Sequence, residues 1–381
     1  MGTERKKDFH RMVSDRIREA REAAGLTQKQ LSDRLGFKDR QTLSSIETGQ
    51  RKITSEELVS VIRILKKDLD FFTDPFRLVG EGAFSWRAQA APAELETFED
   101  KARGWIAAYR ALGEDLGETF SPLTPRLWLN IRSLFEEAWN AAECLNQSWG
   151  LGSKPAPILP RVAEEKLDIL VLHVDMHGLA ISGAACHLPE FDTILINRRD
   201  REGRRAFDFA HELFHILTWP TLPPNHVDTE SPTGHKAKRT EWLANNFAGA
   251  LLMPQDAILD RWKQRGKKDI HNWIKAAADE FGVTALALYN RLRALDLIPV
   301  AERASISEAR LTWTGRVTAV GSLPPPFSAK YMRRIRKALD RGFLSERRAA
   351  SLLDLTTEEM DKLMETYGLA PELGRAAGDG A

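Results

Sequence analysis

Hydrophobic positions in the first 67 residues recur at the spacing of amphipathic helices, with polar capping signals and glycines between them. The approximate limits of the predicted helices are residues 11–24, 28–36, 41–48 and 55–65. Two of them begin with a capping box, in which Thr27 faces Gln30 and Thr54 faces Glu57. The pattern therefore predicts a small all-α head over residues 1–70.

The next 80 residues show a weaker pattern. Residues 68–100 read as a connector with scattered Phe, Gly and Pro, and residues 94–150 have helical periodicity. Two apolar stripes are expected in that helical part, one made by Trp105, Ala108 and Leu112 and the other by Leu127, Ile131, Leu134 and Phe135. We expect a linker and helical connector over residues 71–150, with the tryptophans in the core.

Strand and helix patterns are mixed in residues 150–300. Apolar runs at residues 168–172 and 193–197 are the clearest strands. Helical periodicity marks residues 203–218, 238–252, 267–281 and 284–295. A chain of 381 residues is too long for one ordinary core. The chain therefore predicts an α+β core over residues 151–300, followed by a basic helical C-terminal module over residues 301–381.

The composition is that of an ordinary globular protein, with 43% hydrophobic and 29% charged residues. The charged N-terminus, the lack of a membrane-length apolar run and the presence of only two cysteines predict a cytoplasmic protein without a disulfide framework. Residues 1–67 contain 16 Lys and Arg against 10 Asp and Glu, a charge of +6 in a chain of net charge +1. This excess favours a polyanionic partner, although a solvated charged face would explain the charge alone equally well.

A His-Glu-x-x-His motif lies inside the periodic segment 203–218, at His211, Glu212 and His215. Residues four apart in a helix lie on one face, so both imidazoles could bind the same tetrahedral zinc ion. Glu212 could take a proton from the attacking water and pass it to the leaving amine. Two solvated histidines are the alternative, but a helix that buries this segment would bury unpaired imidazoles at a cost. The motif therefore predicts a zinc peptidase centre.

A third ligand has to come from elsewhere, and Glu241 is the best candidate. It lies in the predicted helix 238–252, on the same side as Ala244 and Ala248. An isolated glutamate on a helix is usually solvated, so the pattern alone leaves its role open.

Four stretches around these residues resemble the ImmA/IrrE family of metallopeptidases. They are Ile194–Asn197, Arg204–His215, Glu241–Ala248 and Leu251–Pro254. The resemblance covers about residues 150–300 and implies a zincin-like fold of the gluzincin kind. It also implies that His211, His215 and Glu241 bind Zn²⁺ and that Glu212 is the catalytic base.

One residue departs from that family pattern. Phe214 stands where many members have Gly, and we expect it to narrow the cleft without loss of zinc. The residue that would stabilise the oxyanion is not evident, and the candidates are His226, His235 and Tyr289.

Residues 16–66 resemble the XRE/Cro-type helix-turn-helix family, through Ala24–Ser32 and Leu43–Arg51. In such a domain the start of the third helix contacts base edges in the major groove, and the flanking residues contact phosphates. The residues expected to contact DNA are Arg40, Gln41, Thr42, Ser44 and Ser45 at the bases, and Gln28, Lys29, Arg51 and Lys52 at the phosphates. The resemblance implies an operator in double-stranded DNA and a homodimer bound to it, and a protein-docking domain of the same fold is the alternative.

The C-terminal module is basic, with eight Lys and Arg between Lys330 and Arg348. A capping box at Thr356 and Glu359 follows, which suggests a small helix-turn-helix-like unit. A second nucleic-acid contact and a docking module are equally compatible with this pattern.

These features together predict a multidomain protein, with an all-α helix-turn-helix head, a helical connector, an α+β zincin-like core and a helical tail. The resemblances imply a transcriptional regulator with a zinc-dependent endopeptidase domain, which cleaves a repressor-like protein or itself in response to stress or a mobile element. Self-cleavage is expected in the connector, between about Phe72 and Pro92. The alternatives are a regulator whose zincin domain is a sensor that cleaves nothing, and an antitoxin.

Overall fold

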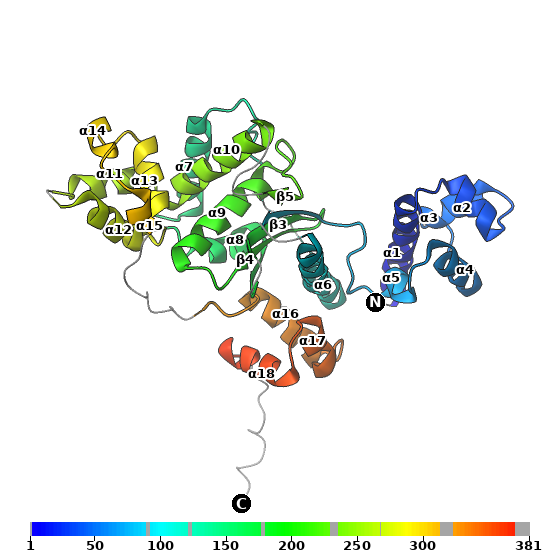
Figure 1. Cartoon of the computed structure of the whole chain (residues 1–381). Coiled ribbons are helices and arrows are strands. Elements are labelled where there is room, and N and C mark those ends of the chain that lie inside the picture. Colours follow the sequence, from blue (N-terminus) through cyan, green and yellow to red (C-terminus); the bar gives the residue numbers. More distant parts are fainter. Residues whose placement is uncertain are drawn as a thin grey trace, which may run out of the picture.

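The computed structural model describes residues 2–88, 92–120, 124–176, 180–228, 235–266, 268–312 and 323–369. A helical head, an α+β core and a helical C-terminal module follow one another along the chain, and the head stands beside the rest of the molecule (Figure 1). No helix in these ranges combines the length and the apolar character that a membrane span requires.

The head consists of short helices, as the sequence predicts. Their bounds are α1 Gly2–Ala23, α2 Gln28–Leu35, α3 Arg40–Glu47, α4 Ser55–Leu65 and α5 Leu69–Thr73. Both predicted capping boxes form, at Thr27 for α2 and at Thr54 for α4. Ile17, Leu31 and Val61 are fully buried at the centre of the bundle. Helix α1 begins at Gly2, well before the expected residue 11.

The predicted connector is largely structured. Phe72, Leu78 and Val79 are buried, and residues 83–88 form strand β1, Ala83–Ala88, within the main sheet. A core that starts at residue 151 would leave this strand out. The buried Arg16 of α1 donates hydrogen bonds to the carbonyl oxygens of residues 71, 74 and 77, which joins the head to the connector.

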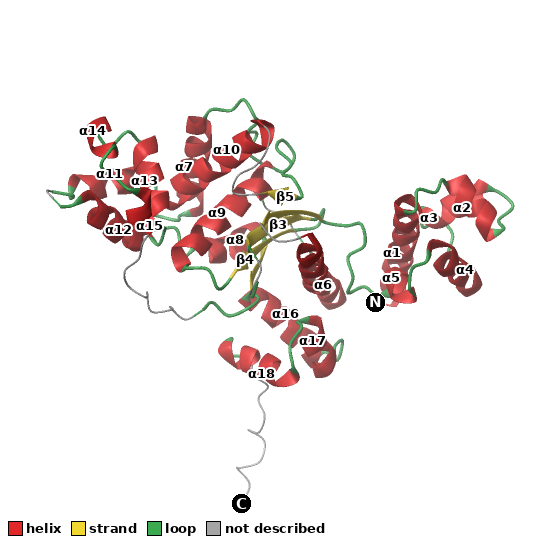
Figure 2. Cartoon of the chain, viewed as in Figure 1, coloured by secondary structure: helices red, strands yellow, loops and turns green. Residues whose placement is uncertain are grey.

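Within the described ranges, five strands form the sheet of the core, in the order β2-β4-β3-β1-β5. Figure 2 shows this sheet in yellow among the helices. The other four strands are β2 Leu170–Val174, β3 Ile181–His187, β4 Asp192–Asn197 and β5 Val227–Asp228. Strand β3 pairs antiparallel with both β1 and β4, whereas β2 with β4 and β1 with β5 are parallel. The predicted strands correspond to β2 and β4, and β1, β3 and β5 are additional.

Different helices cover the two faces of the sheet, and alternate residues of each strand point to opposite faces. Val171 of β2 packs with the helices of one face, which are α7 Phe135–Trp149, α8 Leu159–Leu167, α9 Glu202–Thr218, α10 His235–Leu252, α11 Gln255–Lys263, α12 Ile270–Phe281 and α13 Ala285–Ala294. Short helices α14 Val300–Arg303 and α15 Glu308–Thr312 follow. Leu170 and Leu172 pack on the opposite face with α6 Pro92–Leu116 and the C-terminal helices.

One predicted apolar stripe is wrong. Residues 124–130 form no helix, and Ile131 and Leu134 lie before α7 with exposed side chains. Trp105, Ala108 and Leu112 of α6 are buried as predicted. Residues 124–134 lie along the end of α9, where the backbone nitrogen of Leu127 donates to the carbonyl oxygen of Leu217 at 2.8 Å. This tertiary contact replaces the helix that the apolar spacing suggested.

The C-terminal module contains α16 Ala329–Asp340, α17 Glu346–Leu352 and α18 Thr357–Thr366, and the rest of the predicted module includes residues 313–322 and 370–381, outside the described ranges. Five of its eight basic side chains are in ion pairs, namely Lys330 with Asp168, Arg334 and Lys337 with Glu118, Arg336 with Asp340, and Arg348 with Asp74. Much of the basic charge therefore neutralises acids of the same chain, and this favours packing on the core over a second nucleic-acid contact.

Candidate metal and DNA sites

Helix α9 carries several polar side chains in the interior of the core. Every residue from Asp208 to Thr218 is buried, and His211, Glu212 and His215 are each about 1% exposed. The helix packs against strands β3 and β4 on one side and α10 on the other. Its first turn lies so close to the loop before α13 that a β-carbon at Gly203 would lie 2.5 Å from the carbonyl carbon of Val283. Tertiary packing therefore holds both histidines in place.

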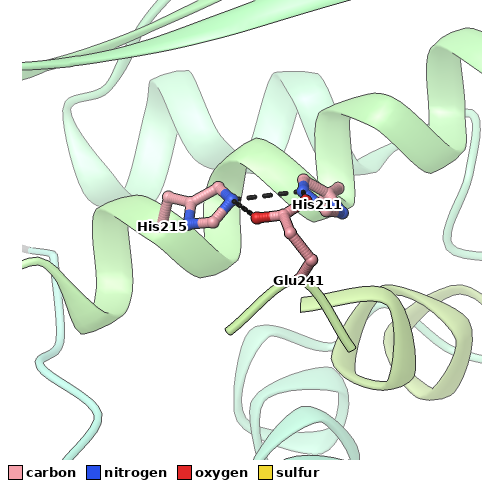
Figure 3. A group of neighbouring side chains, drawn as sticks. All are labelled: His211, His215 and Glu241. Atoms are coloured by element: carbon pink, nitrogen blue, oxygen red, sulfur yellow. Dashed lines mark hydrogen bonds and ion pairs between the residues drawn. The ribbon is translucent and has the colours of Figure 1, made fainter. Parts of the chain in front are cut away.

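The two histidines and Glu241 of α10 meet at one point (Figure 3). The Nε2 atoms of His211 and His215 lie 3.1 Å apart. The Glu241 carboxylate oxygens lie 3.2 Å from Nε2 of His211 and 3.4 Å from Nε2 of His215. Within the described ranges, these three residues form the one group of at least three His, Cys, Asp or Glu side chains with the spacing of a metal site.

These separations fit a zinc ion. Donor atoms about 2.0–2.1 Å from a tetrahedral zinc lie about 3.3 Å from one another. The donors are also of the right kind, because imidazole nitrogen and carboxylate oxygen are ordinary zinc ligands. The set leaves one tetrahedral position open, as in catalytic zinc sites.

Asn245 sets the orientation of the first histidine. Its Oδ1 lies 3.0 Å from Nδ1 of His211, and it follows Glu241 by one helical turn on α10. When Nδ1 of His211 carries the proton and donates it to this oxygen, Nε2 keeps its lone pair. That lone pair faces the point where the two histidines and Glu241 meet, so it is available to a metal ion. Asn245 belongs to the family-like stretch in the sequence, but its role becomes evident only from this contact.

Burial and charge keep the candidate ligands in metal-binding form. Burial lowers the pKa of His211 to about 4, so the imidazole is neutral at pH 7. Burial opposes ionisation of Glu241, but its interactions with His211 and His215 hold its pKa well below the ordinary value. A neutral histidine and an ionised glutamate are the states that bind a cation.

Glu212 lies between the histidines on the side of α9 that faces the sheet. Burial raises the pKa of its carboxyl group to about 8, and neither carboxylate oxygen has a hydrogen-bond partner among the described residues. A β-carbon at Gly183 of β3 would lie 3.4 Å from Cγ of Glu212, which is an ordinary van der Waals distance, so Glu212 packs directly against this position of the sheet. Burial of a carboxyl group without partners is costly, and groups perturbed in this way are concentrated at catalytic sites, so Glu212 is the candidate for a catalytic base.

The other residues considered from the sequence lie outside this group. Phe214 is fully buried against Phe247, so it packs the core and does not narrow a cleft as expected. His226 lies 2.7 Å from Glu99 of α6, His235 is exposed at the start of α10, and Tyr289 is a core residue of α13. In the described part of the chain, none of these three side chains forms a hydrogen bond or an ion pair with His211, His215 or Glu241.

The head presents part of its expected DNA-contacting set to solvent. Lys29, Arg40, Gln41 and Lys52 are exposed, whereas Thr42, Ser44 and Ser45 are partly buried along α3. Thr42 also donates its hydroxyl group to the N-cap residue Asp39, at 3.1 Å.

Two of the expected phosphate contacts are engaged inside the head. Gln28 donates to the buried Glu47, which also accepts from Arg21 at 2.7 Å. Arg51 forms a bidentate ion pair with Glu57. These contacts stabilise the helix-turn-helix, so the exposed lysines and Arg40 remain the freer cations.

Comparison with known families confirms both resemblances. A helix-turn-helix family model matches residues 17–72, and the model of the IrrE N-terminal-like domain, a peptidase family, matches residues 164–293. A search of curated proteins found no match to the chain. The chain thus joins an XRE-type helix-turn-helix domain to an IrrE/ImmA-like metallopeptidase-family domain.

Proposed function

We propose that this protein is a DNA-binding transcriptional regulator whose core is a zinc-dependent endopeptidase acting on a repressor-like protein. The helix-turn-helix head indicates DNA-binding regulation, and the IrrE-like domain indicates a metallopeptidase-family core. The observation that carries the proposal is the buried, unbonded carboxylate of Glu212 beside three convergent donor groups.

In this proposal each residue of the site has one task. His211, His215 and Glu241 hold the zinc ion, and Asn245 fixes the ring of His211. Zinc in such a site supplies Lewis-acid polarisation of the scissile carbonyl and lowers the pKa of the attacking water. Glu212 takes a proton from that water onto a carboxylate oxygen as the water oxygen bonds to the carbonyl carbon. The proton then passes to the amide nitrogen as the C–N bond breaks.

Cleavage of another protein is favoured over cleavage of the connector. Phe72 is fully buried, Leu78 and Val79 are buried, and residues 83–88 pair with β3 within the sheet. An endopeptidase binds an extended segment, so cleavage within residues 83–88 would require β1 to be removed from the sheet. A homodimer on the operator, which the XRE resemblance implies, would bring two peptidase cores to one DNA site and raise their concentration near a bound repressor.

A sensor that binds zinc and cleaves nothing is the second candidate. The distinguishing feature is Glu212, since a site that only binds a ligand has no need of a buried general base.

Replacement of Glu212 by Gln tests the choice between these candidates. Glu212→Gln keeps the size of the side chain and removes its basicity, so cleavage should fall by about 10²–10⁴-fold while zinc and DNA binding persist. Wild type and variant are each produced together with the proposed substrate, a repressor-like protein encoded by a neighbouring gene, and the repressor and the peptidase are followed by mass spectrometry. If wild type produces no repressor fragments, or if the variant produces as many as wild type, the endopeptidase proposal is wrong and the sensor takes its place.

A further inference from the structure

Strand β1 contributes one charged side chain to the face of the sheet that α9 covers. Its neighbours Trp86 and Ala88 point toward α6 and join the core on that side. Arg87 points the other way, and its Nη1 lies 3.2 Å from Oδ1 of Asp208 on α9. Asp208 precedes Glu212 by one helical turn, so the two side chains share a face. Arg87 therefore reaches α9 on the side that carries Glu212.

The register of the sheet brings Arg87 next to the space that Glu212 occupies. Arg87 pairs with Gly183 of β3, and cross-strand partners point to the same face. Gly183 is the position of β3 against which Cγ of Glu212 packs. The register shifts between Arg87 and Ala88, a kind of irregularity that re-aims side chains beside functional sites.

The charges in this part of the core complement each other. The Arg87 side chain is 15% exposed, and its Nη1 has no hydrogen-bond partner in the described ranges. A buried guanidinium is retained at low cost only near carboxylates, and Asp208 and Glu212 are the two on this face of α9.

We propose that Arg87 is a positioning residue for peptide hydrolysis, which holds the Glu212 carboxylate beside the His211, His215 and Glu241 site. The inference rests on the proposed peptidase function. Neither carboxylate oxygen of Glu212 has a hydrogen-bond partner among the described residues, so Arg87 acts on it through the attraction of opposite charges, which favours the rotamers that keep its oxygens near the site. The simpler alternative is that Arg87 only neutralises Asp208.

Inhibitor binding to cobalt-substituted full-length protein tests the proposal without the need for a protein substrate. Acetohydroxamic acid binds a metal ion as its anion, after it has transferred a proton to a nearby base, here Glu212. The change in the visible absorption of the cobalt ion on titration gives the affinity of the inhibitor. Arg87→Met and Glu212→Gln should each weaken binding by about 10-fold, and the double variant should be no weaker than Glu212→Gln. Arg87→Lys should restore part of the loss, and Arg199→Met, at an exposed ion pair with Asp175, should change nothing.

Asp208 variants separate the two explanations of Arg87. If Arg87 positions Glu212, Asp208→Asn with Arg87→Met should bind the hydroxamate as weakly as Arg87→Met alone. Recovery of wild-type affinity in that double variant, or unchanged affinity in Arg87→Met, would overturn the proposal. Metal content and melting temperature show whether Arg87→Met is folded. If it is not, the affinity of Arg87→Lys for the hydroxamate is compared with that of wild type instead. A wild type that cleaves no repressor would contradict the proposed function, while the hydroxamate comparison would still decide the role of Arg87.

Discussion

Helices α3 and α9 both carry residues expected to meet a ligand, but they present them in opposite ways. Arg40 and Gln41 at the start of α3 are exposed, and only the inner side of that helix is buried. On α9 every residue from Asp208 to Thr218 is buried, including both histidines of the candidate metal site. Long exposed side chains can adapt to a DNA surface, whereas a metal requires donors held at fixed distances. The helix expected to contact DNA therefore needs little tertiary support at its exposed end, whereas the helix of the candidate metal site depends on such support.

The head has a small counterpart of the buried polar site. Glu47 is 2% exposed and accepts hydrogen bonds from Arg21 and Gln28, so these three side chains join α1, α2 and α3. Here, in contrast to the α9 site, the described partners already satisfy the carboxylate. A satisfied buried group stabilises the fold, and an unsatisfied one points to a ligand or a reaction.

Loss of a metal ligand should have the largest effect. His211→Ala should reduce zinc from near one per chain to trace amounts, because two remaining donors bind zinc weakly. Asn245→Ala keeps all three donors and should weaken zinc binding by about 10–100-fold, since it releases only the orientation of His211. Elemental analysis and competition with a chelator measure both effects.

Glu241→Ala offers the sharpest check of the ligand set. Full zinc retention in this variant would exclude Glu241 as a ligand, even though its oxygens lie within 3.4 Å of both imidazoles. DNA binding serves as the control in all three variants, because the head has its own core.

Breaking the buried ion pair of the head should have the next largest effect. Glu47→Ala leaves Arg21 buried without its main partner and should destabilise the head by about 3 kcal/mol, the low end for such pairs, because Arg21 keeps its bond to the carbonyl oxygen of Leu26. Hydrogen exchange of the full chain, followed by mass spectrometry, should show faster exchange in residues 17–72. Zinc content should not change. Equal exchange in wild type and variant would show that the pair contributes nothing to the stability of the head.

Changes at the DNA-facing surface should have the smallest effects. Arg40→Ala should relax sequence preference at one base pair per half-site, at a cost of about 1–3 kcal/mol. Lys52→Ala should weaken binding on all sequences and reduce the salt dependence by about one counterion. The matched control is Lys337→Ala in the C-terminal module, where the lysine pairs with Glu118 at 2.9 Å. DNA-binding titrations at several salt concentrations measure these effects. If Lys337→Ala loses as much DNA affinity as Lys52→Ala, the C-terminal module also contacts DNA.

Local patterns in the sequence were sufficient for much of the fold. The capping boxes at Thr27 and Thr54 and the helices α9, α10, α12 and α13 form as predicted, because caps and helical periodicity depend on residues close together in the chain. Strands β2 and β4 were also evident, since each is a short apolar run. Strand β1 was not evident, because its six residues acquire their partners from β3 and β5, about 100 or more positions later.

For the candidate metal site as well, some features follow from local sequence and others from tertiary packing. The sequence by itself determined which face of α9 carries His211 and His215, because helical geometry brings residues four apart to one side. Only the tertiary structure decided that Glu241 meets them, that Asn245 orients the first imidazole, and that Arg87 pairs with Asp208, one helical turn before Glu212. These contacts join helices and strands that are far apart in the chain. Their geometry depends on how α9 packs between the sheet and α10, and no local pattern of residues specifies that packing.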